Sequence, residues 1–292
     1  MSASSPVVDH LSIERAADGV DWSGNRHEPG VRTARIVSLV PSLTELLFDL
    51  GLDTQIVGRT GFCIHPKAAV RKVPKVGGTK DIKLERIISL KPTHVIVNVD
   101  ENRREDADAL RDAGIAVVVT HPMEPADNLA LYTLAGRLFG VEQRAAELCD
   151  ALRAALADIS SHDMKLGVLY LIWRRPWMTI SADTYLARML ALAGLEPVAV
   201  DTDARYPQVE DDDPAWQRAD AVLLSSEPFP FRAKHIPEVA SMRGRSVDRV
   251  MCVDGELLSW YGSRAVGGVR YAKALGDRLR ASVAGATGQR DR

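Results

Sequence analysis

Short, mostly β-branched apolar runs alternate with helical segments along most of the chain. In the first half, strands are expected over residues 35–40, 94–97 and 115–119, and helices over residues 84–90 and 103–112. Strands that alternate with helices of this length form βα units, whose strands lie side by side and run mainly parallel. The sequence therefore predicts an α/β fold.

A strand-free stretch separates this series from a second one. Residues 128–161 have helical periodicity, and residues 141–159 contain neither Gly nor Pro, which predicts about 28 Å of continuous helix. Strands are expected again over residues 166–173, 221–225 and 249–253. The helix is either one long surface helix or a rigid spacer. The second interpretation predicts two α/β lobes with mainly parallel sheets, joined by one long rigid helix, with a ligand cleft between the lobes.

The same pattern gives the expected domain organisation. Residues 1–34 are expected to be a disordered or extended N-terminal segment, and residues 286–292 a tail. Between them lie a first α/β lobe at residues 35–127, a connecting helical segment at residues 128–164 and a second α/β lobe at residues 165–285.

The charge balance and the apolar runs exclude two classes of protein. The 37 basic and 39 acidic residues give a formal net charge of −2, which provides no field to attract nucleic acid. The apolar run at residues 167–173 is far shorter than the roughly 20 residues that cross a bilayer, so no transmembrane segment is expected.

Cysteine usage and the N-terminal sequence bear on the compartment. Cys63, Cys149 and Cys252 are odd in number and widely spaced, which fits a reducing compartment better than a disulfide framework. Residues 1–34 are polar and lack the apolar block of a secretory signal. We therefore expect a cytoplasmic protein, with a periplasmic location as the alternative if an export signal lies outside this chain.

The loops that follow the strands are the candidates for a binding site, because ligands of open α/β sheets bind beyond the carboxyl ends of the strands. Of the 16 aromatic residues, 11 lie between Tyr170 and Tyr271, several of them in such loops beside Arg or Glu. Rings in these places either stack on a flat ligand or plug the ends of the sheet. The ligand contacts predicted in these loops are Trp173, Arg174, Trp177, Glu227, Phe229, Glu256, Trp260, Tyr261 and Arg264.

The sequence shows little that points to catalysis. Cys63 and His65 are the candidate metal ligands, with a buried free cysteine as the alternative. The chain has no G-x-S-x-G elbow and no phosphate-binding loop of the G-x-x-x-x-G-K-[ST] type. We therefore predict no catalytic residue and no required cofactor.

Four segments of the first half resemble a known family. They are RIVSLVPSLTELLFDLG at residues 35–51, VGRTGFCIHP at residues 57–66, VPKVGG at residues 73–78 and LERIISLKPTHVIV at residues 84–97. These segments are similar to the helical-backbone metal-receptor superfamily, the substrate-binding proteins that deliver cobalamin, haem and ferric siderophores to ABC importers. Within it the chain resembles the cobalamin-binding receptors most, as a branch without an export signal. The resemblance implies two α/β lobes held by one long helix, with the ligand in the cleft.

The resemblance also implies particular contacts. It places corrin-contacting aromatic residues at Phe62, at Tyr206 in the motif RYPQ, and at Trp260. Two tryptophans of the family's first lobe are replaced here by Thr79 and Asn98.

A permease of an ABC importer is the implied protein partner. The family has one docking glutamate in each lobe, and these positions fall on Glu85 and on the acidic run at Asp212.

Together these features predict a non-catalytic substrate-binding protein for a metal chelate. A corrinoid such as cobalamin is the leading ligand, and haem or a ferric siderophore is the alternative. Arg174, Arg205 and Arg264 would bind carboxylate or phosphate edges of the ligand. The competing hypothesis is a cytoplasmic enzyme or metallochaperone on the same fold. The residues available to it are Glu227, Glu256, His235 and Cys63.

Overall fold

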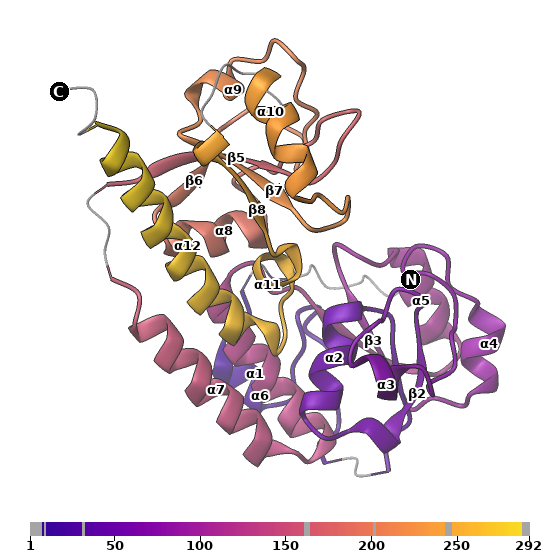
Figure 1. Cartoon of the computed structure of the whole chain (residues 1–292). Helices are drawn as coiled ribbons and strands as arrows, with labels where there is room; N and C mark the ends of the chain where they lie inside the picture. The colour runs from indigo at the N-terminus through magenta and orange to yellow at the C-terminus, as the bar shows by residue number, and fades with distance from the viewer. Residues whose placement is uncertain are drawn as a thin grey trace. The chain divides into compact units, whose positions relative to one another are not determined.

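The chain forms two α/β units. The computed structural model describes residues 8, 10–30, 33–160, 164–200, 203–242 and 247–287. Unit 1 comprises Met1–Arg153 and Tyr261–Arg264, and unit 2 comprises Ala154–Trp260 and Ala265–Arg292. Each unit holds one sheet of four parallel strands, so the predicted α/β fold is confirmed. In Figure 1 unit 1 runs mainly from indigo to magenta and unit 2 from rose to yellow.

The sheet of unit 1 has the strand order β2-β1-β3-β4. Its strands are β1 (Ile36–Ser38), β2 (Ile56–Arg59), β3 (His94–Asn98) and β4 (Ala116–Thr120). The α-helices that begin within residues 1–153 are α1 (Ile13–Ala17), α2 (Pro41–Asp49), α3 (Lys67–Val70), α4 (Leu84–Ser89), α5 (Arg104–Asp112), α6 (Asn128–Phe139) and α7 (Glu142–Ala157).

The sheet of unit 2 has the strand order β6-β5-β7-β8. Its strands are β5 (Leu166–Leu171), β6 (Leu195–Pro197), β7 (Ala221–Ser225) and β8 (Val250–Val253). The remaining helices are α8 (Tyr185–Leu192), α9 (Ala215–Arg218), α10 (Ile236–Met242), α11 (Gly255–Ser259) and α12 (Arg264–Thr287).

Helix α7 accounts for most of the helix expected over residues 141–159. The chain passes from unit 1 to unit 2 within this helix, between Arg153 and Ala154. Residues 161–163 of the expected connecting segment and residues 288–292 of the expected tail lie outside the described part of the chain.

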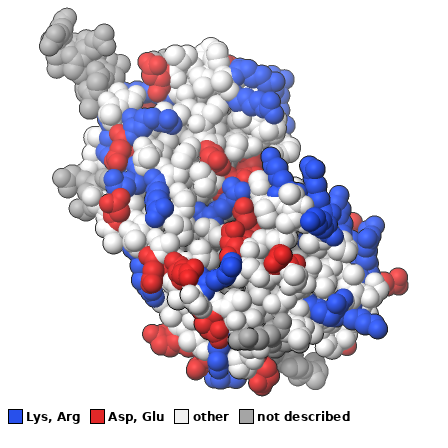
Figure 2. Space-filling model, turned by 60° about the horizontal axis from the view of Figure 1, so that its bottom comes forward, with Lys and Arg blue, Asp and Glu red and all other residues white. Residues whose placement is uncertain are grey.

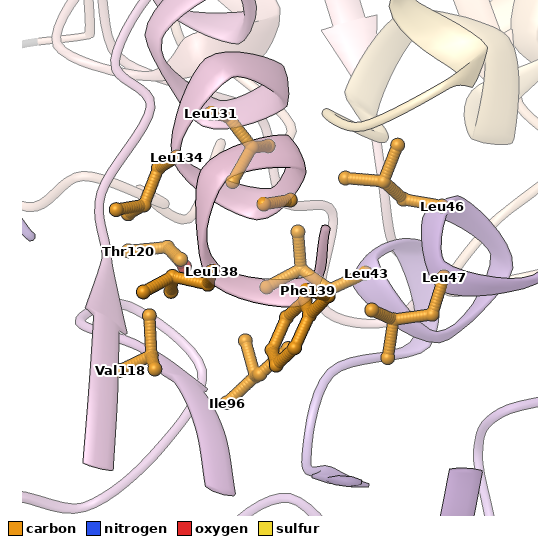
Figure 3. A pocket seen from close by; sticks show the side chains of 11 residues that line it. Leu43, Leu46, Leu47, Ile96, Val118, Thr120, Leu131, Leu134, Leu138 and Phe139 are labelled. Atoms are coloured by element: carbon orange, nitrogen blue, oxygen red, sulfur yellow. The ribbon is translucent and has the colours of Figure 1, made fainter. Parts of the chain in front are cut away.

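In unit 1, helices α2 and α6 pack against one face of the sheet. Leu43 and Leu47 of α2 and Leu138 of α6 face Ile96 and Val118, which are paired in register on β3 and β4. Figure 3 shows these side chains around a cavity of about 20 Å³. The lining is almost wholly apolar, so we interpret the space as a packing gap rather than a ligand site.

In unit 2, alternate residues of the strands face one core. Leu169 and Leu171 of β5 and Val222 and Leu224 of β7 belong to this core, because residues two apart on a strand share a face. Trp216 of α9 is fully buried in the same cluster. The sequences of these strands are continuous apolar runs because other parts of the protein cover both faces of a parallel sheet.

The N-terminal segment is folded over residues 10–30, in contrast to the expectation that residues 1–34 are disordered or extended. Ser12 caps α1 through a side-chain hydrogen bond to the Arg15 N–H. Trp22 is fully buried and its backbone N–H donates to the carbonyl of Val119 on the edge strand β4. We call residues 10–30 the N-terminal arm. The polar composition misled the prediction because one buried tryptophan and one buried carboxylate fix the arm.

That carboxylate belongs to Asp21, which is fully buried. Its Oδ1 accepts the backbone N–H groups of Ser23 (2.9 Å) and Asn25 (3.1 Å), and its Oδ2 accepts the N–H of Val119 at 3.0 Å. The Nε2 atom of His27 lies 2.9 Å from the same Oδ2. A buried charge is tolerated only with such partners, so Asp21 joins the arm to the sheet.

The substitution Trp22→Ala tests the arm. We expect it to lower the free energy of unfolding of unit 1 by about 3–5 kcal/mol, because a fully buried ring is lost. Ile13→Ala, on the same arm but 37% exposed, is the control and should cost less than about 1 kcal/mol. Urea denaturation measures both. Equal effects of the two substitutions would contradict a folded arm.

His94 of β3 predicts a pH dependence of stability. Its ring meets Phe139 edge-on at 5.4 Å, and burial, assisted by nearby His27, lowers the pKa of His94 from 6.5 to about 4. The folded state therefore favours the neutral imidazole. The stability that this gives is complete above pH 6.5 and is lost as the pH falls toward 4, with a cost of about 2 kcal/mol at pH 5.

Because other groups also titrate between pH 7 and pH 5, the pH dependence of the free energy of unfolding is compared between the parent protein and His94→Gln. We expect the free energy of unfolding to fall between pH 7 and pH 5 by about 2 kcal/mol more in the parent protein than in His94→Gln. An identical pH dependence in the two proteins would rule out His94 as the source.

Candidate functional site

The carboxyl ends of β5, β7 and β8 lie at one edge of the unit 2 sheet, because these strands are parallel neighbours. The predicted site residues that follow these strands are therefore brought to the same edge. They are Trp173 and Arg174 after β5, Glu227 and Phe229 after β7, and Glu256 and Trp260 after β8.

At this edge, the Glu227 side chain connects the loop after β7 with the segment after β8. Its Oε1 atom accepts the indole N–H of Trp260 at 2.8 Å and lies 2.9 Å from the hydroxyl oxygen of Ser259. The loop after β7 thus holds a ring that follows α11. Trp260 is half-buried, so part of the fixed indole remains accessible.

Gly255 allows these two loops to approach. A Cβ atom at Gly255 would lie 2.4 Å from Ser225 Oγ and 2.8 Å from Glu227 Cγ, closer than any side chain can tolerate. The Ser225 hydroxyl also lies 3.0 Å from the hydroxyl of buried Tyr170, and burial raises the pKa of Tyr170. The position of Glu227 is therefore set by close packing as well as by hydrogen bonds.

A small ribbon extends beyond β5. Met178 pairs antiparallel with Trp173 on one side and with Gln208 on the other. Trp173 is 40% exposed, and Tyr206, two residues before Gln208, is 48% exposed. Phe229 supports Trp173 edge-on, with ring centroids 5.9 Å apart.

Trp177 differs from the other predicted aromatic contacts. It is only 6% exposed, and its ring stacks on Phe231 at 6.4 Å and meets Trp216 edge-on at 5.8 Å. The structure therefore places Trp177 in the core of unit 2, where it anchors the ribbon.

Two of the predicted cationic contacts bind protein groups in unit 2. Arg174 forms an ion pair with Glu238 at 2.7 Å, and this hydrogen bond lowers the pKa of the Glu238 carboxyl. Arg205 donates from Nε to the carbonyl of Asp183 at 2.9 Å. Glu256 lies half-buried in the first turn of α11.

In unit 1, Phe62 follows β2 and is 62% exposed. Its neighbour Cys63 is buried, with its sulfur 3.0 Å from the hydroxyl of Thr44 and 3.2 Å from that of Thr60. Burial raises the pKa of the Cys63 thiol, so the thiol stays protonated. Within the described residues, no group of three metal-ligating side chains includes Cys63 or His65.

Tyr261–Arg264 leaves unit 2 and belongs to unit 1, and we call this segment the clasp. The Gly262 N–H donates to Asn128 Oδ1 at 2.6 Å, and the hydroxyl of Tyr132 donates to the Gly262 carbonyl at 2.7 Å. Gly262 has φ +86°, and a Cβ there would lie 3.1 Å from the Ser42 carbonyl oxygen. Glycine is required at this position for both reasons.

The ends of the clasp carry two predicted ligand contacts, Tyr261 and Arg264. The Tyr261 hydroxyl donates to the carboxylate of Glu101, and burial together with the Glu101 charge raises the pKa of Tyr261 well above its usual value. Arg264 binds Glu45 of α2 through two hydrogen bonds, of 2.5 and 3.1 Å. A ligand contact by Arg264 would have to compete with this pair.

The residues that hold the clasp were missed by sequence reasoning. Asn128 is 134 residues from Gly262, and Glu45 is 219 residues from Arg264. Their only local signal is a polar residue at the start of an apolar helix for Asn128 and a glutamate in a leucine-rich helix for Glu45.

The two predicted docking residues lie at the surface. Glu85 is exposed in the first turn of α4, and Asp212 is exposed in the turn that precedes α9. On the face drawn in Figure 2, acidic and basic side chains both occur and neither sign covers the whole face. No helix in the described part of the chain is both long and apolar enough to cross a membrane.

Comparison with known proteins identifies the family. A family model described as periplasmic binding protein matches residues 36–243. The chain belongs to this family. The resemblance drawn from the sequence is thereby confirmed.

The chain is similar in sequence to an ABC transporter substrate-binding lipoprotein and to a vitamin B12-binding protein. YvrC, an ABC transporter substrate-binding lipoprotein of Bacillus subtilis (strain 168), is 29% identical over 249 residues, covering 80% of this chain and 77% of YvrC. The vitamin B12-binding protein of Vibrio campbellii (strain ATCC BAA-1116) is 28% identical over 178 residues, covering 60% of this chain and 64% of that protein.

Solved structures share the fold of this family member. The periplasmic vitamin B12 binding protein BtuF of Vibrio cholerae has a TM-score of 0.72 at 19% identity, covering 86% of this chain and 98% of BtuF. The periplasmic heme-binding protein BhuT, in complex with two hemes, has a TM-score of 0.70 at 22% identity, covering 86% of this chain and 99% of BhuT.

The relatives overturn the expected cytoplasmic location. YvrC is a lipoprotein and BtuF is periplasmic, so the family points to a place outside the cytoplasm. Cysteine spacing misled the prediction because a free cysteine that packs as a small apolar side chain says little about the compartment. Here Cys63 and Cys149 are buried and all three cysteines are free.

The pair between Arg264 and Glu45 can be tested by a double-mutant cycle. The side chains are only 19% and 15% exposed, so we expect a coupling energy of about 1–3 kcal/mol in the free energy of unfolding. The exposed pair Lys165–Glu196 is the control, and should give less than about 1 kcal/mol. Coupling no larger than that of the control would contradict a structural role for the clasp.

Proposed function

We propose that this protein binds a flat metal chelate of the corrinoid or haem class and presents it to an ABC permease outside the cytoplasm. The observation that carries the proposal is the exposure of its aromatic rings. Among the described residues, the large apolar side chains that stay exposed include three aromatic ones: Phe62 after β2, Trp173 after β5, and Tyr206, two residues before the paired Gln208 of the ribbon. Rings exposed in this way gain apolar contact when a planar ligand covers them.

The edge of unit 2 supports the proposal further. Trp173 is supported by Phe229, and Trp260 is oriented by Glu227 before any ligand arrives. A ring that is already held loses little freedom on binding, which favours affinity. We assign Glu227 the role of a positioning residue for Trp260, rather than of an acid or base.

Stacking, rather than charge, is the main source of affinity in this proposal. Arg174 and Arg264 are bound to Glu238 and Glu45, so their charges are already compensated. Corrinoid and haem ligands both offer large planar faces, and relatives of this chain include a vitamin B12-binding protein and, by fold, a heme-binding protein.

The competing enzyme or metallochaperone hypothesis has less support. Cys63 is a buried thiol whose raised pKa disfavours the thiolate, and no group of three metal-ligating side chains among the described residues includes it. The Nδ1 atom of buried His235 accepts the backbone N–H of Arg232 at 2.9 Å, as expected of a structural histidine.

Calorimetric titration with cobalamin, haemin and ferric siderophores tests the proposed function. We expect Trp173→Ala and Trp260→Ala each to weaken binding of the preferred chelate by roughly tenfold, since each removes a stacked ring. Glu227→Ala should weaken binding less and shift the Trp260 fluorescence to the red, because the indole loses its fixed partner. Ile88→Ala, at an exposed residue of α4, is the control and should bind as the parent protein does.

Two outcomes would remove the proposal. One is that neither cobalamin nor haemin binds with a Kd below about 100 μM, or roughly −5.5 kcal/mol, whether or not a ferric siderophore does. The other is that the chelate binds but both tryptophan substitutions leave its affinity unchanged.

A further inference from the structure

We propose that His10, Glu124 and Asp127 form a binding site for a divalent transition-metal ion of the zinc class. The site lies in unit 1 and is separate from the chelate-binding edge proposed for unit 2. The imidazole nitrogen and one carboxylate oxygen from each acidic residue all lie within 4.8 Å of one another. The described residues contain no other group of three or more such side chains.

Two distant segments of the chain meet at this site. His10 belongs to the N-terminal arm, which the buried Trp22 and Asp21 fix against β4. Glu124 and Asp127 belong to the 3₁₀ helix Pro125–Asp127 and its N-cap, which follow β4. The site is therefore assembled by the tertiary structure and does not exist as a local sequence motif.

Hydrogen bonds orient the carboxylate at the centre of the site. Asp127 is 7% exposed, and its Oδ2 accepts the backbone N–H groups of Met123 (2.7 Å) and Glu124 (2.9 Å). This directs Oδ1 toward His10, whose Nδ1 lies 2.9 Å away. Backbone contacts of this kind orient carboxylates that bind metals, while the second oxygen remains the ligand atom.

The third ligand is held in a similar way. The Glu124 side chain accepts the backbone N–H of Asp127, as part of a reciprocal capping box. The carboxylate therefore stays close to Asp127, and it forms no ion pair with any other residue that the structure describes.

The donor set selects the class of metal. One imidazole nitrogen with two carboxylate oxygens suits zinc and its neighbours, whereas calcium and magnesium prefer all-oxygen sets with more ligands. In a tetrahedral site, ligand atoms about 2.0–2.2 Å from zinc lie about 3.3–3.6 Å apart. The three ligand atoms now lie within 4.8 Å of one another, so the side chains need only a small adjustment. His10 is 52% exposed, which leaves access for the ion and room for a water ligand.

Binding would fix the tautomer of His10. The imidazole would bind the metal through the Nδ1 atom that now faces Asp127 and carry its one remaining proton on Nε2, so a protonated His10 would release one proton to solvent. The metal would join the arm to the segment after β4. Since the arm pairs with the edge of β4 at Val119, zinc is expected to stabilise unit 1 as a whole.

Titration of the full chain with Zn²⁺ alone, followed by calorimetry, tests the site. We expect one ion per chain, and binding weakened at least roughly tenfold in both His10→Gln and Glu124→Gln. Glu124→Gln keeps the capping oxygen, so its fold is preserved. His65→Gln, at the half-buried histidine beside Cys63, is the matched control and should bind zinc as the parent protein does.

Thermal unfolding provides a second readout. Zinc should raise the melting temperature of the parent protein and of His65→Gln, but not that of His10→Gln. The proposal is overturned if zinc does not bind below about 1 mM, or if His10→Gln binds it as tightly as the parent protein. Neither result bears on chelate binding, which the tryptophan variants test independently.

Discussion

Each of the two sheets is built only from parallel strands, and this constraint determines where functional side chains can lie. A parallel strand cannot be followed directly by its neighbour, so the chain returns over a face of the sheet before the next strand begins. All the carboxyl ends of a sheet therefore lie at one edge. In unit 2 this brings Trp173, Glu227 and Trp260 to that edge, although long crossovers separate them in sequence.

The contact between Glu227 and Trp260 shows how this edge is made rigid. A half-buried carboxylate costs free energy unless its oxygens are bound, and here the indole N–H and the Ser259 hydroxyl lie within hydrogen-bond distance. Gly255 makes the approach possible because no side chain fits there. The same arrangement that compensates the charge also fixes the aromatic face to which we propose that the ligand binds.

The N-terminal arm forms hydrogen bonds with β4, the outermost strand of the unit 1 sheet. An edge strand presents unpaired backbone groups, and β4 is such a strand. The Trp22 N–H and the Asp21 carboxylate satisfy the carbonyl and the N–H of Val119. Because the arm passes beside the segment after β4, it also brings His10 to Asp127. The contacts that cover the outermost strand therefore also assemble the proposed metal site.

Periodicity along the chain predicts the α/β class, the strands β1, β3, β4, β5, β7 and β8, the long helix α7 and the loops that carry the aromatic residues. These features depend on periodicity and on neighbours a few residues apart, which a sequence displays directly. Which aromatic side chain of a loop is exposed depends instead on packing against distant parts of the chain. Trp173 and Trp177 lie in one short segment, yet Trp173 is 40% exposed and Trp177 is 6% exposed, because the ribbon turns one ring onto Trp216 and Phe231. The contacts of Arg264 with Glu45 and of Trp22 with Val119 could not be predicted from the sequence either. Each of them joins residues that are far apart along the chain and that only the fold brings together.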